Sequence, residues 1–357
     1  MSQGRGRRPT LDTVAREVGV SRATVSNAYN RPDQLSAELR ERIILTAAQL
    51  GYGGPDPVAR SLATRRGGAV AFMLGSPLSA AFSDPALTIV LDSLSATMDS
   101  DDRALLLMPG GGDGPRPESV ARAHAEIAIA YSLPDDAPAL AEVRRRLLPL
   151  VVIDQPVIPG SVRVDIADED GARLAARHLT DLGHRTVAVL AFALGTDGER
   201  GPVTPYRLAN ARYRVTRDRI RGYFDGLGDD APIWEAPGCR RDFGREGAHW
   251  LLTRSPRPTA LLCMCDELAL GAIRAAADLN LRVPQDLSIV GFDDTPAAEW
   301  ADPPLTTVHQ DLAEKGRRAG DLAANLLDGT RPAPVTTLAV TLVNRASTMR
   351  PSPNRGQ

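Results

Sequence analysis

The segment from Ser21 to Asn27, SRATVSN, carries polar side chains at the spacing of one helical face. The guanidinium group of Arg22 can form two hydrogen bonds with guanine, and the amide of Asn27 can form two with adenine. Ser21, Ala23 and Ser26 share this face, which contains no apolar stripe. The pattern suits the reading of base edges, although an ordinary helical hairpin can present the same spacing.

A second set of chemically capable side chains follows short apolar runs later in the chain. Ligands of open α/β sheets bind beyond the carboxyl ends of the strands, so residues at those ends are candidates for a binding cleft. Carboxylates and an aromatic face there would suit a small hydroxyl-rich ligand. The candidates are Ser79, Phe82, Asp84, Cys265, Asp266, Asp293 and Asp294. Helix capping would equally account for Asp266 and Asp294, and core packing for Phe82.

The polar face around Arg22 needs a helical scaffold, and the flanking sequence predicts one. Thr10 is the expected N-cap of a first helix, which Gly19 ends because glycine tolerates the left-handed conformation. Ser21 and Ser36 are the expected N-caps of a second and a third helix. Three such helices can enclose a small core of their own. Its predicted members are Leu11, Val14, Ala15, Val18, Val20, Val25, Ala28, Leu39, Ile43, Ala47 and Leu50.

Four linked motifs stand in this region: TLDTVAREVGVSRATVS at 10–26, Asn-Arg-Pro at 30–32, Leu-Gly-Tyr at 50–52 and Val-Ala-Arg-Ser-Leu at 58–62. Together they resemble the N-terminus of the LacI/GalR family of bacterial transcription regulators. In that family the second helix enters the major groove and nearby polar residues contact phosphates. Many relatives have arginine or histidine in place of Asn27, which leaves the base sequence of the operator open. The resemblance implies DNA contacts at Thr10, Ser21, Arg22, Ala23, Thr24, Asn27, Asn30, Arg60 and Leu62.

Residues 53–68, GGPDPVARSLATRRGG, are bounded by glycines and predict a linker. Asp56 and Pro57 can begin a helix, yet the seven residues that follow are too few for a stable isolated one. We therefore expect a hinge helix that orders only against DNA and a second subunit. The resemblance implies that Leu62 wedges into the minor groove. The alternative is a leucine docked on the rest of the chain.

The composition is that of a soluble globular protein, with 43% hydrophobic and 24% charged residues among 357. No segment is long and apolar enough to cross a membrane, and the N-terminus lacks the apolar core of a signal peptide, so we expect a cytoplasmic protein. The three cysteines form no CxxC pair, so neither a disulfide framework nor a metal site is expected. We expect no cofactor.

The net charge of -2 hides an asymmetry between the two parts of the chain. Residues 1–66 contain 11 arginines against 6 acidic residues, which leaves a charge of -7 for the remainder. A basic head on an acidic body favours attraction of the head to phosphates. A solvated basic face would give the same count.

From residue 69 onward, apolar runs alternate with helical patterns, which indicates repeated βα units. The predicted strands are 69–74, 104–108, 126–131, 150–154, 187–192, 260–264 and 288–292. The predicted helices are 86–99, 137–147, 168–182, 217–227, 242–253, 266–279 and 311–328. Seven strands over this length suggest two doubly wound lobes.

The resemblance implies that these lobes form a type I periplasmic-binding-protein-like body with crossovers near 160, 295 and 325. The fold class is thus an all-α helix-turn-helix head with a hinge helix, followed by a two-lobed α/β effector body. We expect the DNA-binding domain at 1–54, the hinge helix and linker at 55–68, a ligand-binding and dimerisation domain at 69–350, and a tail at 351–357. The lobes are expected at roughly 69–165 plus 296–325, and 166–295 plus 326–350.

The resemblance also selects residues that would meet an effector. Arg219 with Gly222, the run CDELALG at 265–271, VGFDD at 290–294 and the stretch from Pro304 to Gln310 all resemble family segments around the cleft. Relatives often have asparagine or serine in place of Cys265. The implied effector is a sugar or sugar-derived molecule, with purines and nucleosides as alternatives. The predicted effector contacts are Phe82, Asp84, Arg219, Cys265, Asp266, Asp293 and Gln310.

Three classes of function compete for this sequence. An enzyme is disfavoured because GxGxxG, GxxxxGK[ST] and GxSxG are all missing, and because His178 and His184 are badly spaced for a metal. A solute-binding or transport-related receptor without a DNA function is the alternative, but it would need an export signal. We therefore expect a repressor that binds a pseudo-palindromic double-stranded DNA operator as a homodimer under the control of a small molecule. Residues 193–216 are predicted either to line the cleft or to form a flap.

Overall fold

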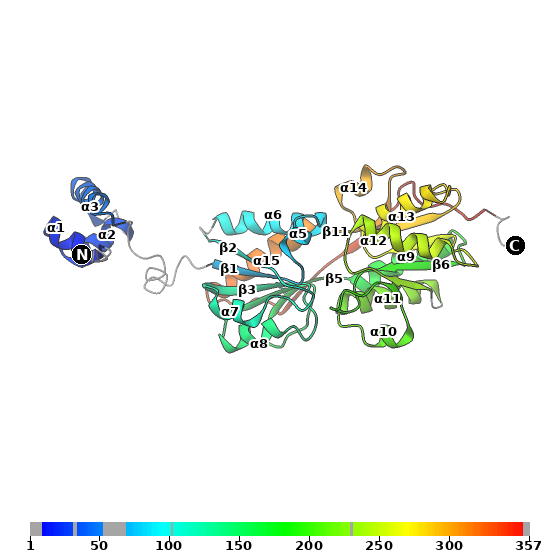
Figure 1. Ribbon diagram of the computed structural model, residues 1–357, viewed down its shortest axis with the longest axis horizontal. Coiled ribbons are helices and arrows are strands. Elements are labelled where there is room, and N and C mark those ends of the chain that lie inside the picture. Colours follow the sequence, from blue (N-terminus) through cyan, green and yellow to red (C-terminus); the bar gives the residue numbers. More distant parts are fainter. Residues whose placement is uncertain (1–8, 31–33, 53–68, 101–102, 229–230, 353–357) are drawn as a thin grey trace, which may run out of the picture. The chain divides into compact units, whose positions relative to one another are not determined.

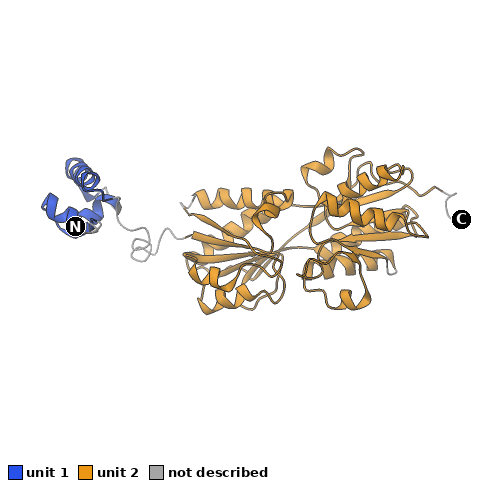
Figure 2. Ribbon diagram, viewed as in Figure 1, with its two compact units in different colours: residues 1–68 blue, residues 69–357 orange. Residues whose placement is uncertain are grey.

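The structure is a computed structural model that describes residues 9–30, 34–52, 69–100, 103–228 and 231–352. The chain divides into two compact units, Met1–Gly68 and Ala69–Gln357 (Figure 2). No helix within the described ranges is long and apolar enough to span a membrane. Each unit has a hydrophobic core of its own.

The first unit contains the three predicted helices, α1 (Leu11–Val18), α2 (Arg22–Asn30) and α3 (Ala37–Gln49). Thr10 and Thr13 form a capping box at the start of α1, and Gly19 ends that helix with a φ of 76°. The Ser36 hydroxyl accepts a hydrogen bond from the amide of Leu39 at the start of α3. These caps confirm the predicted helix limits. The buried core consists of Val14, Ala15, Val25, Ala28, Ile43 and Ala47.

The second unit contains two separate sheets, each covered by helices on both faces (Figure 1). The first sheet has the order β12-β5-β4-β3-β1-β2, and all its pairings are parallel. Its strands are β1 (Ala69–Leu74), β2 (Leu105–Met108), β3 (Ala125–Tyr131), β4 (Leu150–Ile153), β5 (Val162–Ile166) and β12 (Val335–Leu338). The helices of this lobe are α5 (Leu78–Ala81), α6 (Pro85–Ser100), α7 (Pro117–Arg122), α8 (Pro138–Arg145) and α15 (Leu312–Leu327).

The second sheet has the order β13-β11-β10-β9-β6-β8-β7, with antiparallel pairs at both edges. Its strands are β6 (Val187–Ala191), β7 (Gly201–Pro202), β8 (Ile233–Glu235), β9 (Ala260–Cys263), β10 (Ser288–Asp293), β11 (Thr306–Gln310) and β13 (Val340–Val343). Its helices are α9 (Asp168–Asp181), α10 (Pro205–Ala209), α11 (Arg214–Leu227), α12 (Arg241–Leu252), α13 (Asp266–Asp278) and α14 (Pro296–Glu299).

Three crossovers connect the lobes, as predicted, but they lie at other positions. They fall between β5 and α9, between β11 and α15, and between β12 and β13. The predicted lobe limits are therefore corrected in two places. Residues 296–310 belong to the second lobe, because β11 pairs with β10 over four residues. Strand β12 belongs to the first lobe, because it pairs with β5.

Glycines allow the covering helices to approach one another closely. A Cβ atom on Gly222 of α11 would lie 2.1 Å from the carbonyl oxygen of Glu169 in α9. A Cβ atom on Gly271 of α13 would lie at the same distance from the carbonyl oxygen of Arg241 in α12. Interiors are packed too tightly to absorb such overlaps without backbone movement. The helix pair α9 and α11 is fixed in this way, and α11 carries several residues of the cleft described below.

Replacing Gly222 with alanine should lower the free energy of unfolding by about 1–3 kcal/mol, because the new methyl group overlaps a backbone carbonyl. Gly111→Ala is the matched control, since nothing lies within 4 Å of its added Cβ and its φ is not positive. Urea unfolding followed by circular dichroism measures both. Equal stability of the two variants would contradict the close packing of α9 and α11.

Candidate functional site

The second helix of the head presents the predicted polar face. Ser21, Arg22 and Ala23 are exposed, whereas Thr24 and Asn27 are half-buried. The Ser21 hydroxyl accepts a hydrogen bond of 3.0 Å from the amide of Thr24, so it caps α2. The Asn27 side chain donates a hydrogen bond of 3.4 Å to Gln34.

Among the described residues, the one ion pair of Arg22 is a weak contact of 3.9 Å with Asp12, and both side chains are largely exposed. Such a contact is worth little in water, so the guanidinium group remains available to a base or a phosphate. Thr10 is occupied as the cap of α1. The predicted contacts at Asn30, Arg60 and Leu62, and the hinge helix, involve side chains outside the described residues.

In the second unit, a cavity of about 190 Å³ lies between the carboxyl ends of the two sheets. Both lobes line it. The first lobe supplies Asp84, Ala86, Tyr131, Ser132, Asp154, Gln155 and Lys315. The second lobe supplies Phe192, Ala193, Tyr213, Val215, Arg219, Gly238, Cys239, Cys265, Asp293 and Gln310.

Arg219 is the most strongly held side chain on the second-lobe wall. Its Nε donates a hydrogen bond of 2.8 Å to Asp168 Oδ1, and its Nη1 donates one of 2.5 Å to the carbonyl oxygen of Met264. The guanidinium carbon lies 3.5 Å from the centre of the Phe292 ring. Burial lowers the pKa of Arg219, but the carboxylates of Asp168 and Asp293 outweigh that effect and raise it. Arg219 is therefore a fixed cation.

A chain of polar contacts runs from Arg219 across the cavity to the first lobe. Asp293 Oδ1 lies 3.9 Å from Arg219 Nη1 and accepts a hydrogen bond of 2.5 Å from Gln310 Nε2. The ammonium group of Lys315 donates to Gln310 Oε1 at 2.5 Å and to Asp154 Oδ1 at 2.8 Å. Gln310 ends β11 of the second sheet, whereas Lys315 and Asp154 belong to the first lobe. The chain thus joins both walls.

The carboxyl groups of Asp84 and Asp293 and the thiol of Cys265 also belong to the cavity wall. Asp84 Oδ1 accepts hydrogen bonds from the amides of Ala86 and Leu87, and burial raises the pKa of its carboxyl group. Burial also raises the pKa of Asp293, against the opposing effect of Arg219. The thiol of Cys265 is buried, and burial raises its pKa well above the usual value. The Cys265 thiol therefore contributes a neutral, weakly polar surface to the cavity wall.

Two predicted effector contacts lie elsewhere. The Phe82 side chain is 67% exposed and is not among the residues that line the cavity, because the short helix α5 turns it away. Asp266 is fully buried: Oδ1 accepts from Thr307 at 2.6 Å, and Oδ2 accepts from the amide of Thr295 at 2.7 Å. Burial raises the pKa of Asp266 to about 7. Its carboxyl group links α13 to β11 and to the start of α14, so its place is structural.

The other five predicted effector residues, Asp84, Arg219, Cys265, Asp293 and Gln310, line the cavity, and their contact with an effector stays a prediction. Several lining residues were missed. The strand-end rule, applied to every predicted strand, would have found those that follow β3, β4 and β6, namely Tyr131, Ser132, Asp154, Gln155, Phe192 and Ala193. Lys315 had one further signal, because it is the only lysine in the sequence.

The segment 193–216 contains β7 and α10 and reaches the cavity at both ends, through Ala193 and Val215. Ion pairs fix its middle. Arg207 donates to Asp197 Oδ2 at 2.7 Å and to Glu235 Oε2 at 2.8 Å. Hydrogen bonding to Arg207 lowers the pKa of Asp197 to about 2. The segment therefore lines the cleft, which was one of its two predicted roles.

The comparisons with known proteins agree with this architecture. Residues 10–54 match the bacterial regulatory proteins of the lacI family, and residues 176–348 match the periplasmic binding protein-like domain. An HTH-type transcriptional regulator of Mycolicibacterium smegmatis is 40% identical over 334 residues, which cover 89% of this chain and 91% of the relative. The chain belongs to the LacI family. It is a DNA-binding transcriptional regulator, and the family consists of regulators rather than enzymes.

Two solved structures of LacI-type regulators show the same arrangement. The Lac repressor dimer bound to operator and the anti-inducer ONPF is 26% identical, with a TM-score of 0.74 and coverage of 96% of this chain and 100% of that one. The transcriptional regulator CelR in complex with cellobiose is 26% identical, with a TM-score of 0.68 and coverage of 95% and 100%.

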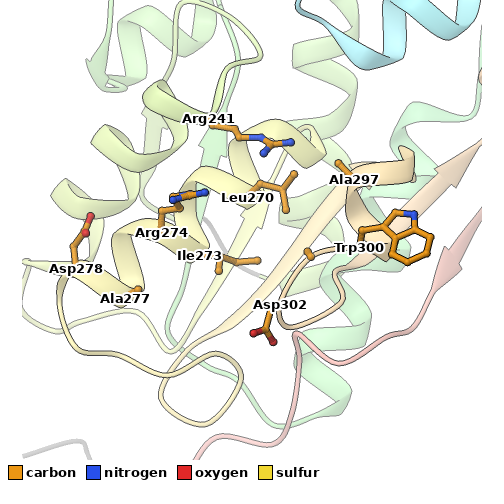
Figure 3. Close-up of a pocket in the computed structure, with 10 residues that line it drawn as sticks. Arg241, Leu270, Ile273, Arg274, Ala277, Asp278, Ala297, Trp300 and Asp302 are labelled. Atoms are coloured by element: carbon orange, nitrogen blue, oxygen red, sulfur yellow. The ribbon is translucent and has the colours of Figure 1, made fainter.

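A second hollow on this LacI-family body, about 530 Å³, lies in the second lobe alone (Figure 3). Its lining includes Arg241, Arg274 and Trp300, and the Trp300 side chain is 83% exposed. All the residues that line this hollow belong to the second lobe. A ligand there would not contact both lobes, so the cleft cavity is the candidate effector site.

Replacing Lys315 with methionine should lower the free energy of unfolding by about 3–5 kcal/mol, because the buried carboxylate of Asp154 loses its counter-charge. The double variant Lys315→Met/Asp154→Asn should regain part of that loss, since asparagine is neutral and tolerates the positive φ of 65° at this position. Urea unfolding measures both variants. A double variant less stable than the single one would contradict the ion pair.

Proposed function

We propose that this LacI-family regulator is a repressor that binds a pseudo-palindromic operator as a homodimer, and that a neutral, hydroxyl-rich molecule in the cleft controls its affinity for DNA. The observation that carries the proposal is the polar chain from Arg219 to Asp154, which lines the cavity and joins both lobes. A ligand that replaced or extended these contacts would change the preferred spacing of the lobes.

The charges of the cavity support a neutral effector. Both cations already face carboxylates, since Arg219 pairs with Asp168 and Asp293, and Lys315 pairs with Asp154. An anionic ligand would have to compete with these buried partners. Hydroxyl groups can instead donate to carboxylates and accept from the cations. Aromatic rings at Tyr131, Phe192 and Tyr213 offer apolar faces for a sugar ring. The cellobiose bound to CelR is a ligand of this kind.

The homodimer is proposed because a head with one recognition helix contacts only a few base pairs. Two heads related by a two-fold axis read the two halves of a palindrome, which multiplies both affinity and specificity. The solved Lac repressor dimer on its operator has this form. Residues 55–68 are proposed as the hinge that carries changes of the body to the heads.

Arg22→Ala should weaken binding to the specific operator by about 1–3 kcal/mol while changing affinity for random DNA little, because the bidentate contact with a base is lost. The operator is first selected from a random DNA pool with the wild-type protein, and fluorescence anisotropy then gives both affinities. Arg16→Ala, on α1, is the matched control for the loss of one positive charge. Equal losses on both DNAs would remove Arg22 from base reading.

Asp293→Ala should abolish ligand binding while operator binding is kept. Asp293 is the cavity carboxylate that lies near Arg219 and accepts a hydrogen bond from Gln310. Binding is measured as thermal stabilisation by a panel of neutral monosaccharides, disaccharides and sugar alcohols. Phe82→Ala is the matched control, since Phe82 lies outside the cavity and should leave binding unchanged.

An Asp293→Ala protein that is still stabilised by the same sugar would move the effector site elsewhere. A wild-type protein that binds a sugar but selects no DNA sequence would favour the alternative, a solute-binding receptor without a DNA function.

A further inference from the structure

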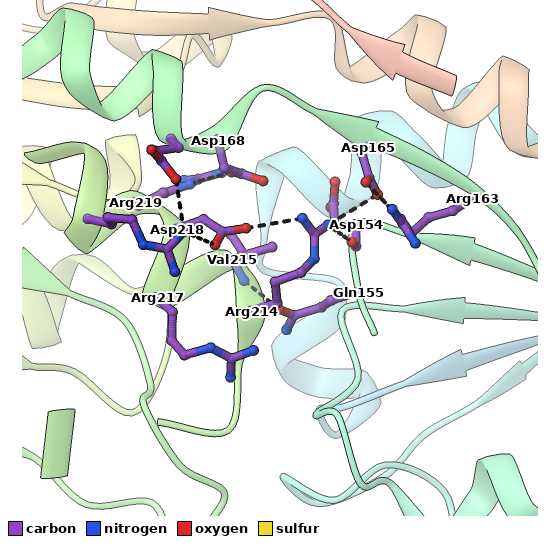
Figure 4. Close-up of polar contacts among 12 residues, drawn as sticks. Asp154, Gln155, Arg163, Asp165, Asp168, Arg214, Val215, Arg217, Asp218 and Arg219 are labelled. Carbon is purple, nitrogen blue, oxygen red and sulfur yellow. Dashed lines mark hydrogen bonds and ion pairs between the residues drawn. The ribbon is translucent and has the colours of Figure 1, made fainter. Parts of the chain in front are cut away.

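Two lining residues of the cavity are held in place by side chains and amides that reach them from the opposite lobe. Asp154 and Gln155 follow β4 in the first lobe, and they face the first turn of α11 in the second lobe (Figure 4). Arg214 Nη2 donates a hydrogen bond to the carbonyl oxygen of Asp154. The amide of Val215 donates one of 2.7 Å to Gln155 Oε1. Arg214 itself does not line the cavity.

The guanidinium group of Arg214 has fixed anchors on both lobes. It lies 3.2 Å from Asp165 Oδ1 in β5 of the first lobe and 3.1 Å from Asp218 Oδ2 in its own helix. Asp165 is in turn held by Arg163, whose Nε lies 2.8 and 2.7 Å from its two oxygens. Planar guanidinium groups fix the direction of such contacts more closely than an ammonium group does. Arg214 is only 19% exposed, which limits screening by solvent.

The orientation of Asp154 depends on these contacts. Asp154 has a φ of 65°, which is unusual for a residue other than glycine. Its amide donates to the carbonyl oxygen of Val164, its carbonyl oxygen accepts from Arg214, and its carboxylate binds Lys315. A rotation of this corner would move the carboxylate away from Lys315. The geometry of the cavity wall therefore depends on a residue outside the cavity.

Two further arginines flank Arg214 and bind the same lobe. Arg212 Nη2 lies 2.8 Å from Asp113 Oδ1, and its Nε donates to Asp136 Oδ1 at 2.9 Å. Arg217 Nη2 donates to Asp135 Oδ2 at 2.7 Å. We call Arg212, Arg214 and Arg217 the arginine ridge. The outer two are more exposed than Arg214, at 31% and 33%, so their contacts are weaker and more sensitive to salt.

We propose that Arg214 is a positioning residue of the effector cavity, and that it clamps the Asp154–Gln155 corner of the first lobe to α11 with Arg212 and Arg217 as outer anchors. The position of this corner rests on contacts described above, and only its use in effector binding rests on the proposed function. Loss of the clamp lowers the fraction of molecules whose cavity walls are correctly placed, and the apparent affinity for a ligand falls by that fraction.

The single lysine of the chain provides the readout. The full-length protein, made with lysine that carries ¹³C at the ε carbon, gives one side-chain NMR signal, from the Lys315 ion pair. This signal is compared among the wild type, Arg214→Ala, Arg214→Lys and Arg221→Ala. Arg221 lies on the same helix, and its ion pairs within the part of the chain that the structure describes are with Glu169 and Asp218 of its own lobe, so its removal is the matched control.

In Arg214→Ala the Lys315 signal should shift or split, because Asp154 is released. Arg214→Lys should return it part of the way, and Arg221→Ala should leave it unchanged. Urea unfolding of all four proteins separates these effects from a general loss of stability.

An unchanged Lys315 signal in folded Arg214→Ala would overturn the proposal, as would equal shifts in Arg214→Ala and Arg221→Ala. Neither result depends on DNA or on a sugar, so failure here is distinct from failure of the proposed function. For any sugar that the thermal panel identifies, Arg214→Ala should weaken binding about tenfold if the correctly placed fraction falls to a tenth. An unchanged affinity would remove Arg214 from effector binding.

Discussion

Lys315 is the only lysine among the 42 basic residues of the chain, and its ammonium group is buried where the two lobes meet. A buried ammonium group is tolerated only if carboxylates and hydrogen-bond acceptors replace the water it has lost. Asp154 from one lobe and Gln310 from the other provide that replacement. The ion pair is therefore also a link between the lobes, and the cavity walls are built around it.

The contacts of Lys315 with Asp154 and Gln310 connect the cavity to the surrounding fold in both lobes. Gln310 binds Asp293, which lies near Arg219, and Arg219 is packed on Phe292 and bound to Asp168 at the start of α9. Asp168 directly follows the crossover from β5, so the cation in the cavity wall is bound to the segment that connects the lobes. A ligand that alters this chain acts on the hinge between the lobes. That is the physical basis for proposing that a ligand in this cavity controls the DNA-binding unit.

Much of the fold was predictable because its information is local. The capping residues of α1 and α3 and the seven strands that are continuous apolar runs all appear near the predicted positions. The strands that were missed have other patterns. Strand β5, VRVDI, contains Arg163 and Asp165, which pair with each other, and Asp165 also pairs with Arg214 from far along the chain. Strand β11, TTVHQ, is polar because its side chains bind Asp266, Asn344 and Asp293.

The same distinction applies to the site. The strand-end rule located Asp84, Cys265 and Asp293, since it depends only on where strands stop. It failed for Phe82 and Asp266 because it gives no direction for a side chain: α5 exposes the first, and Thr295 and Thr307 enclose the second. Lys315 lies near the start of α15, on the same buried face as Leu312 and Ala319, so its helical spacing gives its burial but not its partners. Only the packing of two lobes makes it a cavity residue.

If a ligand in the cleft controls operator binding, it must bind the free protein and the operator-bound protein with different affinities. The dissociation constant of a sugar that binds the cavity is measured by calorimetry for the free protein and for the protein saturated with its selected operator. Two different constants are expected, and their ratio should equal the change in operator affinity that the sugar causes. Equal sugar affinities in the presence and absence of operator would contradict this expectation, because a ligand that does not distinguish the two states cannot regulate DNA binding.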